Sequence, residues 1–246
     1  GKRIQHAARR VQANFVDDTG QRVDYERLRG SEAYQQLRSA AAALRTFSLE
    51  ALDYRGFRLA FWINTYNALI LDAIVSYGIQ GRIWPWFFLR AAYNIGGLRF
   101  SADAIEHGVL RGNRSHPSYR LRMFPQDDPR RSASLDEVDP RIHMALNCGA
   151  SSCPPIEVYD PQEVDQQLDL ASRGFINGEG VEVDLEHNVL RLSRIFDWYE
   201  GDFGGRKGVL QFVARHLQDD VQSQRVRSGD LAVEYMRYDW SLNRLL

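Results

Sequence analysis

Residues 58–77 are the most hydrophobic segment of the chain and limit the folds available to it most strongly. Apolar side chains recur there at helical spacing, at Leu59, Trp62, Ile63, Tyr66, Leu69, Ile70, Ala73, Ile74 and Tyr77. The spacing predicts a central buried helix. A transmembrane span is not expected, because Asn64, Asn67 and Asp72 interrupt the apolar run.

Asn64 and Asn67 lie on a second face of this helix, three residues apart. A buried amide without a partner costs about 1–3 kcal/mol, so both side chains are expected to be hydrogen-bonded. Two roles fit this requirement. The amides either hold neighbouring loops, or one of them lines a pocket and orients a catalytic histidine or a substrate carbonyl.

The composition places the chain among globular proteins, since its 246 residues are 44% hydrophobic and 11% aromatic. We expect one domain over residues 1–246. The formal net charge of −1 provides no basic field, so neither nucleic acid nor a membrane surface is indicated as a partner. A small-molecule or peptide substrate remains open, and the oligomeric state is not determined by the sequence.

The remaining pattern predicts an α+β fold, mostly helical, with a small antiparallel sheet built from hairpins. We expect helices near 31–45, 48–54, 102–111, 160–177 and 208–217, with a further helix starting at Ser193 and broken at Gly204 and Gly205. Hairpins are expected at 93–100 and 181–192, and a closing strand at 232–238. Residues 84–88 form an aromatic cluster expected in the core, and 113–138 a long loop able to shape the mouth of a site.

Residues 141–155 concentrate the reactive side chains, because both cysteines, His143 and Asn147 occur there. Asp139 and Pro140 favour a short helix over 140–147, and a strand ending at Cys148 is the alternative. Either element places His143 and Asn147 on one face. Cys148 then enters a turn of small residues, in which a thiolate is accessible, so Cys148 is the candidate nucleophile.

The expected helix over 102–111 carries a second pair of candidates, Glu106 and His107. Successive residues of an α-helix point in different directions, so we expect only one of the two side chains to reach a site.

Several segments together resemble the DUF547 family: residues 61–67 (FWINTYN), 105–107 (IEH), 143–148 (HMALNC), 152–154 (SCP), 196–199 (FDWY) and 202–203 (DF). The resemblance implies a bacterial, often exported protein with plant relatives that carry the domain behind a coiled coil. Residues 1–12 contain no apolar run, so no secretory signal is expected in this chain and its compartment stays open. Some plant relatives have serine at the position of Cys153, which favours Cys148 as the functional thiol.

The first functional hypothesis is a cysteine hydrolase or acyl transferase of papain-like or transglutaminase-like type, acting on a peptide-like or other small amide or thioester. Cys148 is the expected nucleophile, with His143 or His107 as base and Glu106 as the group that orients it. The expected substrate-binding residues are Asn64, Asn67, Asn147, Gly149 and Cys153, with Asn64 or backbone amides near Gly149 as oxyanion donors. Because Cys148 follows His143, a papain-like order would be permuted. This chemistry requires no metal or cofactor.

The second hypothesis is a non-catalytic binding or scaffold domain, in which Cys148 and Cys153 form a structural pair. A disulfide between them would remove the nucleophile unless it were reduced. A zinc site from His107, His143 and the two cysteines is a third interpretation, but the spacing lacks the Cys-x-x-Cys pattern usual in such sites.

Overall fold

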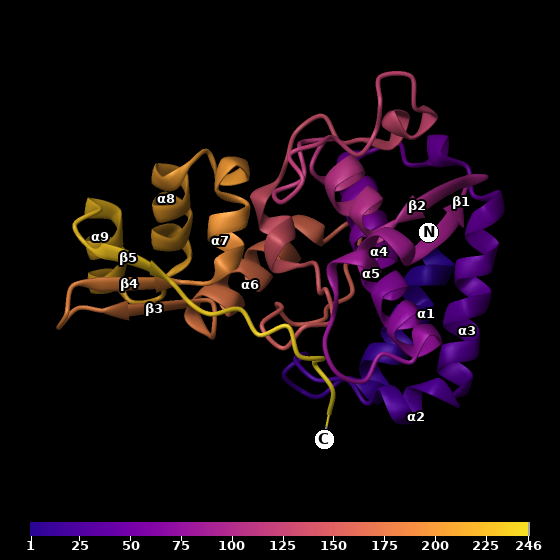
Figure 1. Ribbon diagram of the computed structural model, residues 1–246, viewed down its shortest axis with the longest axis horizontal. Helices are drawn as coiled ribbons and strands as arrows, with labels where there is room; N and C mark the ends of the chain where they lie inside the picture. Colours follow the sequence, from indigo (N-terminus) through magenta and orange to yellow (C-terminus); the bar gives the residue numbers. More distant parts are fainter. Residues whose placement is uncertain (246) are drawn as a thin grey trace.

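The computed structural model describes residues 1–245 and has an α+β architecture with two groups of elements side by side (Figure 1). The N-terminal group contains α1 (Lys2–Phe15), α2 (Tyr25–Arg29), α3 (Glu32–Ala42), α4 (Arg55–Tyr77), α5 (Pro85–Arg90), β1 (Ala92–Ile95) and β2 (Leu98–Ser101). The C-terminal group contains α6 (Val164–Asn177), β3 (Val181–Asp184), β4 (Val189–Leu192), α7 (Arg194–Trp198), α8 (Arg206–His216), α9 (Asp220–Ser228) and β5 (Ala232–Tyr235).

Shorter helical turns connect these elements. Five are 3₁₀ turns in the described part of the chain: η1 (Ala43–Thr46), η2 (Leu49–Ala51), η4 (Pro129–Ala133), η5 (Pro140–Met144) and η6 (Glu200–Phe203). The element η3 (Ala104–Leu110) is a π-helix. Thus α3 is shorter than the helix expected over 31–45, and the helix expected over 48–54 is reduced to the single turn η2.

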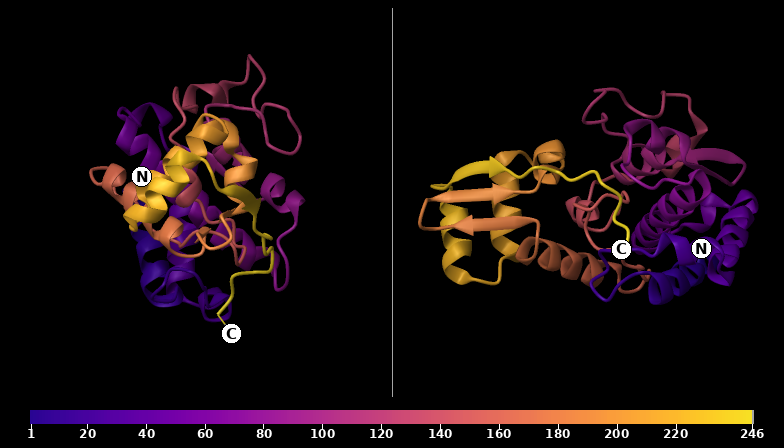
Figure 2. Two further views of the ribbon diagram at one scale, coloured as in Figure 1. Left: turned by 90° about the vertical axis from the view of Figure 1, so that its left-hand side faces the viewer. Right: turned by 60° about the horizontal axis from the view of Figure 1, so that its bottom comes forward.

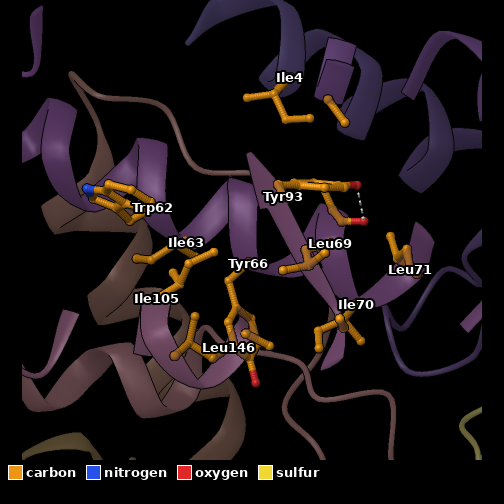
Figure 3. Close-up of a cluster of buried hydrophobic side chains, with 14 of the residues drawn as sticks. Ile4, Trp62, Ile63, Tyr66, Leu69, Ile70, Leu71, Tyr93, Ile105 and Leu146 are labelled. Atoms are coloured by element: carbon orange, nitrogen blue, oxygen red, sulfur yellow. Dashed lines mark hydrogen bonds between the residues drawn. The ribbon is translucent and has the colours of Figure 1, made fainter. Parts of the chain in front are cut away.

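The expected central helix is confirmed as α4, which begins three residues earlier than predicted, at Arg55, and ends at Gly78 in the left-handed conformation (φ +64°). It is long and apolar enough to cross a membrane by length and composition, but 94% of its most apolar window is buried inside the protein, as in a core helix. The helices α1, α2, α3, α6 and η3 surround it. Figure 3 shows its side chains, including Trp62 and Tyr66, packed with Ile105 of η3 and Leu146.

Two hydrophobic cores underlie the two groups, one around α1–α4 and one formed by α6–α9 with β3–β5. Ile142 of η5 belongs to the first core and Met144, two residues later, to the second. The short turn η5 therefore lies between the two cores, and it carries His143 there.

The sheets differ from the single antiparallel sheet that was expected. The predicted hairpins are present as β1–β2 and β3–β4, but they belong to separate sheets, and β5 joins β4 in parallel. A parallel partner requires a long crossover, which α7, α8 and α9 supply. The helix α9 was not predicted, because it buries only Ser223 and Val226 and so has no apolar stripe.

The chain after β5, residues 236–245, forms a C-terminal strap that runs back from the second group to the first (Figures 1 and 2, yellow). Met236 N–H donates to Leu192 O in β4 at 2.8 Å, and Asn243 N–H donates to Gly149 O at 2.9 Å. Ile83 N–H donates to Trp240 O at 3.0 Å. The strap thus connects the sheet of the second group to the loop that contains Cys148 and Cys153 (the cysteine loop) and to the segment before α5.

The aromatic cluster at 84–88 is not entirely core, as had been expected. Phe87 is buried, whereas Trp84 and Trp86 remain 51% and 46% exposed. The helix α5 spans only six residues on the surface, so one side of it faces inward and the other faces solvent.

Candidate functional site

A pocket of about 240 Å³ lies where the two groups meet. Its wall combines residues from α4, α5, η3, the 113–138 loop, η5, the cysteine loop, α7 and the C-terminal strap: Tyr66, Pro85, Phe88, Asp103, Glu106, His107, His116, Pro117, Ser118, Tyr119, His143, Leu146, Cys148, Cys153, Pro154, Ile195, Trp198, Tyr199, Tyr238 and Trp240. The long loop over 113–138, which was expected to shape the mouth of a site, contributes four of these residues.

Glu106 and His107 both line this pocket, which corrects the prediction that only one of them reaches a site. The cause is the π-helix: Arg111 N–H donates to Glu106 O at 2.8 Å, five residues back. The wider turn rotates successive side chains by less than an α-helix does. Adjacent side chains can then share one wall, and single-turn π-helices are frequent at functional sites.

Glu106 is held by a tyrosine rather than by a histidine. The Tyr199 hydroxyl donates to Glu106 Oε1 at 2.5 Å, joining α7 to η3 across the pocket. Burial, together with the nearby Glu106 carboxylate, raises the pKa values of Tyr199 and Tyr66 well above their usual range, so both phenols stay protonated. Glu106 Oε1 lies 3.9 Å from His107 Nδ1, which is beyond hydrogen-bonding distance, so Glu106 does not hold a histidine through a hydrogen bond in this arrangement.

The group that orients His143 is Asp202 of η6, whose Oδ2 lies 2.9 Å from His143 Nε2. Burial opposes ionisation of Asp202, but its bonds to His143 and Arg111 outweigh that effect and hold its pKa well below the usual range. The ionised carboxylate only accepts, so His143 carries its proton on Nε2 and its lone pair on Nδ1. Burial lowers the pKa of His143 despite the opposing bond to Asp202, which keeps the imidazole neutral.

Arg111 connects this pair to His107. Its guanidinium binds Asp202 through Nε at 2.5 Å and Nη2 at 3.1 Å, while Nη1 lies 3.0 Å from His107 Nδ1. A guanidinium only donates, so His107 Nδ1 is the acceptor and Nε2 carries the proton. Burial lowers the pKa of His107 well below its usual range, with a further contribution from the neighbouring His116.

His116 has the same tautomer for a different reason. Its Nδ1 accepts from the backbone N–H groups of Ser118 at 3.0 Å and Tyr119 at 3.3 Å, so its proton also lies on Nε2. The ring packs edge-on against His107 and stacks on Tyr119. Burial lowers the pKa of His116, which is therefore neutral near pH 7.

Asp103 completes this end of the pocket. It is only 4% exposed, its Oδ2 has no hydrogen-bond partner within residues 1–245, and its Oδ1 is 3.9 Å from His107 Nε2. Burial, followed by the charge of Glu106, raises the pKa of Asp103 to about 7. Asp103, His107 and His116 each offer a ligand atom within 4.8 Å of the others, the donor set of a divalent cation. However, both Nε2 atoms carry protons and both Nδ1 lone pairs are occupied, so the imidazoles are not arranged as metal ligands.

The two cysteines form a disulfide, so the expected nucleophile is in its oxidised form here. Cys148 is partly exposed in the pocket wall, whereas Cys153 is buried. The Tyr238 hydroxyl lies 3.4 Å from Cys148 Sγ and 3.1 Å from Cys153 Sγ. Gly149, with φ at +86°, turns the loop against α4, where a Cβ would meet Ile74 Cδ1 at 2.5 Å.

Three backbone amides of this loop, those of Gly149, Ser151 and Cys153, already donate within the protein, so none of these three is free as an oxyanion donor. Gly149 N–H donates to Asn147 Oδ1 at 2.9 Å, and Ser151 N–H donates to Ser241 O of the strap at 2.8 Å. Cys153 N–H donates to Ala150 O at 3.1 Å.

Asn64 and Asn67 are buried and bonded, which confirms that part of the sequence prediction. Asn67 Nδ2 donates to Ala145 O at 3.0 Å, and Asn67 Oδ1 accepts from Asn147 N–H at 2.9 Å. Asn67 therefore fixes the start of the cysteine loop. Asn64 bonds the backbone of Tyr159 in the same way: its Nδ2 donates to Tyr159 O at 2.7 Å, and its Oδ1 accepts from Tyr159 N–H at 2.8 Å. Neither amide lines the pocket beside the cysteines, so both hold loops.

Asn147 and His143 do not share a face, contrary to expectation. The 3₁₀ turn η5 ends at Met144, after which the chain is irregular. Asn147 Nδ2 then donates to Pro154 O at 2.6 Å and closes the cysteine loop, while His143 faces Asp202.

The family described as "Protein of unknown function, DUF547" matches residues 49–176, which is 128 of the 246 residues. The chain belongs to the DUF547 family. No curated protein and no solved structure matches it.

The matched segment of this DUF547 protein contains α4, η3, η5 and the disulfide. Tyr199, Asp202 and Tyr238 lie beyond it and complete the pocket from the second group. Sequence reasoning assigned no role to these three residues or to Asp103 and His116. The motifs at 196–199 and 202–203 were the available signal for Tyr199 and Asp202.

Proposed function

We propose that this DUF547 domain is a cysteine-dependent hydrolase or acyl transferase for a small amide or thioester, with Cys148 as the nucleophile once the disulfide has been reduced. The observation that carries the proposal is the His143–Asp202 pair, whose histidine lies in the same pocket wall as Cys148. A thiol nucleophile requires a neutral imidazole that is held in one tautomer by a third group. With His143 preceding Cys148, the arrangement is a permuted version of papain-like or transglutaminase-like chemistry.

The proposed reaction begins with reduction by a dithiol, which converts the disulfide into two cysteine thiols while the dithiol becomes a disulfide. His143 Nδ1 then takes the Cys148 proton, and the thiolate attacks the substrate carbonyl carbon. The leaving amine or thiol takes that proton as the carbon–heteroatom bond breaks. Water, or an acceptor nucleophile, finally cleaves the acyl–cysteine thioester and releases Cys148.

Three further features of the pocket support this chemistry. Burial keeps His143 neutral, which is the protonation state a general base needs. Tyr238 places a hydroxyl donor 3.4 Å from Cys148 Sγ, close enough to stabilise an oxyanion formed beside the sulfur. The cavity of about 240 Å³ is smaller than the roughly 300–1,000 Å³ of pockets for drug-sized ligands, which favours a small substrate.

A second candidate function is a binding or scaffold domain with a structural disulfide. The observation that favours it is the bond network around the sulfurs, in which Tyr238 of the strap contacts both. In that case the disulfide fixes the strap against the cysteine loop and no thiol is ever exposed. Reduction would then lower the stability of the fold without producing activity.

The test is turnover of 4-nitrophenyl acetate and of a small thioester, with and without a dithiol reductant. We expect activity only after reduction, and activity without reductant in C153S, whose Cys148 cannot be trapped in the disulfide. C148S should be inactive in both states. H143Q should lose activity, whereas H187Q, which changes an exposed histidine in the β3–β4 turn, should keep it. Folded C153S without acyl-cysteine formation or turnover would leave the binding domain as the function.

A further inference from the structure

We propose that Asp103, His107 and His116 form a subsite that binds an alcohol hydroxyl on a small saturated ring, the chemistry of a monosaccharide. This subsite occupies the η3 side of the pocket and needs neither sulfur of the disulfide. It therefore goes beyond the proposed cysteine chemistry and can be tested in the oxidised protein.

The two histidines of the subsite are fixed as donors. Arg111 occupies His107 Nδ1, and the backbone N–H groups of Ser118 and Tyr119 occupy His116 Nδ1. Each of these partners can only donate, so each histidine presents an Nε2–H group. His107 of η3 and His116 of the 113–138 loop both line the pocket, so their Nε2–H groups are the imidazole donors available at this end.

The acceptor of the subsite is the Asp103 carboxyl group. Oδ2 is buried without a partner among the described residues, and leaving such an atom unsatisfied costs about as much as a lost hydrogen bond. Asp103 lies in the pocket wall beside His107 and His116, with ligand atoms of the three within 4.8 Å. The carboxyl group therefore has spare acceptor capacity at the pocket wall, which supports a bound group that donates to it.

A hydroxyl group matches this set atom for atom. Its oxygen accepts from two donors and its hydrogen donates to one acceptor, which are the two Nε2–H groups and the Asp103 carboxyl group. A metal cation does not match, since it would require the Nε2 lone pairs that the protons occupy. An anion matches less well, because Asp103 and Glu106 lie beside the donors.

The rest of the wall determines what carries the hydroxyl. Seven of the lining residues are aromatic: Tyr66, Phe88, Tyr119, Trp198, Tyr199, Tyr238 and Trp240. Aromatic faces pack on the apolar C–H face of a saturated ring while hydroxyls point to polar groups at its edge. A cavity of about 240 Å³ has room for one such ring rather than for a chain of them.

The test uses the oxidised, full-length protein, titrated by calorimetry with methyl β-glucopyranoside, with glycerol, and with 2-methoxytetrahydropyran, which keeps the ring but lacks the hydroxyls. We expect the glucoside to bind at least about tenfold more tightly than the hydroxyl-free ring, because each hydrogen bond to a buried polar group contributes roughly that factor. Glycerol should bind more weakly than the glucoside, since it lacks a ring face. Equal binding of the ring without hydroxyls, or no binding of the glucoside, would overturn the proposal.

Variants and a metal titration complete the design. D103A and H116F should weaken glucoside binding at least about tenfold, and the surface variant H187F should not. If D103A or H116F fails to fold, the ligand series on the wild-type protein still decides the outcome. Stoichiometric binding of Zn²⁺ by the wild-type protein would also overturn the proposal, because it would assign the cluster to a metal. If the reduced wild-type protein has no esterase activity but the oxidised protein binds the glucoside, the cysteine mechanism is rejected and the hydroxyl-binding subsite is kept.

Discussion

Asp103→Asn offers a quantitative test of the polar end of the pocket. Burial, followed by the charge of Glu106, raises the pKa of Asp103 from its ordinary value of 3.8 to about 7 in the folded protein. Between these values the folded state holds a proton that the unfolded state has lost, so the stability of the wild-type protein falls as the pH rises through this window. The full penalty, reached above about pH 7, is on the order of 4 kcal/mol, since one pKa unit corresponds to about 1.4 kcal/mol.

Asparagine keeps the shape of the side chain and removes the charge, so D103N should escape this penalty. Between roughly pH 5 and roughly pH 8, its stability relative to the wild-type protein should rise by about 2.5 kcal/mol. Urea unfolding at the two pH values measures this difference, and other carboxyl groups cancel because both proteins share them. D136N is the matched control, since the Asp136 side chain is 96% exposed and its variant should follow the wild-type curve. A D103N difference that does not change with pH would refute a buried, penalised carboxylate at this position.

Three further substitutions test the fold around the pocket by urea unfolding. Trp62→Ala should destabilise the protein by about 3–5 kcal/mol because the ring is fully buried, whereas Trp84→Ala, at a half-exposed residue, should cost far less; equal effects would contradict the assigned core. Asn67→Ala should cost about 1–3 kcal/mol through its lost backbone bonds, and an unchanged midpoint would reject that role. Arg111→Met should cost about 3–5 kcal/mol by leaving Asp202 buried without its main cation; a neutral effect would show that Arg114 replaces it.

Much of the framework follows from local sequence signals. The period of 58–77 is sufficient for α4, and alternating residues around short polar turns are sufficient for both hairpins. The sequence was sufficient to predict that Asn64 and Asn67 are each hydrogen-bonded, because buried amides require partners, but it did not identify those partners. These features share one property, which is that a few neighbouring residues determine them.

Other features depend on contacts that no local pattern encodes. The π-helix η3 has the apolar spacing of an α-helix, and its backbone bonding across five residues, as from Arg111 N–H to Glu106 O, distinguishes it. The parallel pairing of β5 depends on how α7–α9 cross the second core.

In the candidate site, too, some residues were predictable from the sequence, whereas their contacts depend on the fold. Glu106, His107, His143 and Cys148 were placed together from sequence, and all four line the pocket. The partner of His143 lies 59 residues away in the other group of elements, so its identification required the fold. The tautomers of the three pocket histidines likewise depend on what each Nδ1 or Nε2 atom touches, which is a property of the folded chain.

The proposed cysteine mechanism requires His143, held by Asp202, to activate Cys148 after reduction. The most direct measurement is the rate of iodoacetamide alkylation of Cys148 in C153S as a function of pH, followed by mass spectrometry, with C153S/H143Q as the comparison and C153S/H187Q as the control. An unperturbed thiol reacts with an apparent pKa of about 8.5. We expect the apparent pKa of the Cys148 thiol to lie below about 7.5 in C153S and in C153S/H187Q. In C153S/H143Q it should return to the unperturbed value. Superimposable profiles with and without His143, both near about 8.5, would contradict the account.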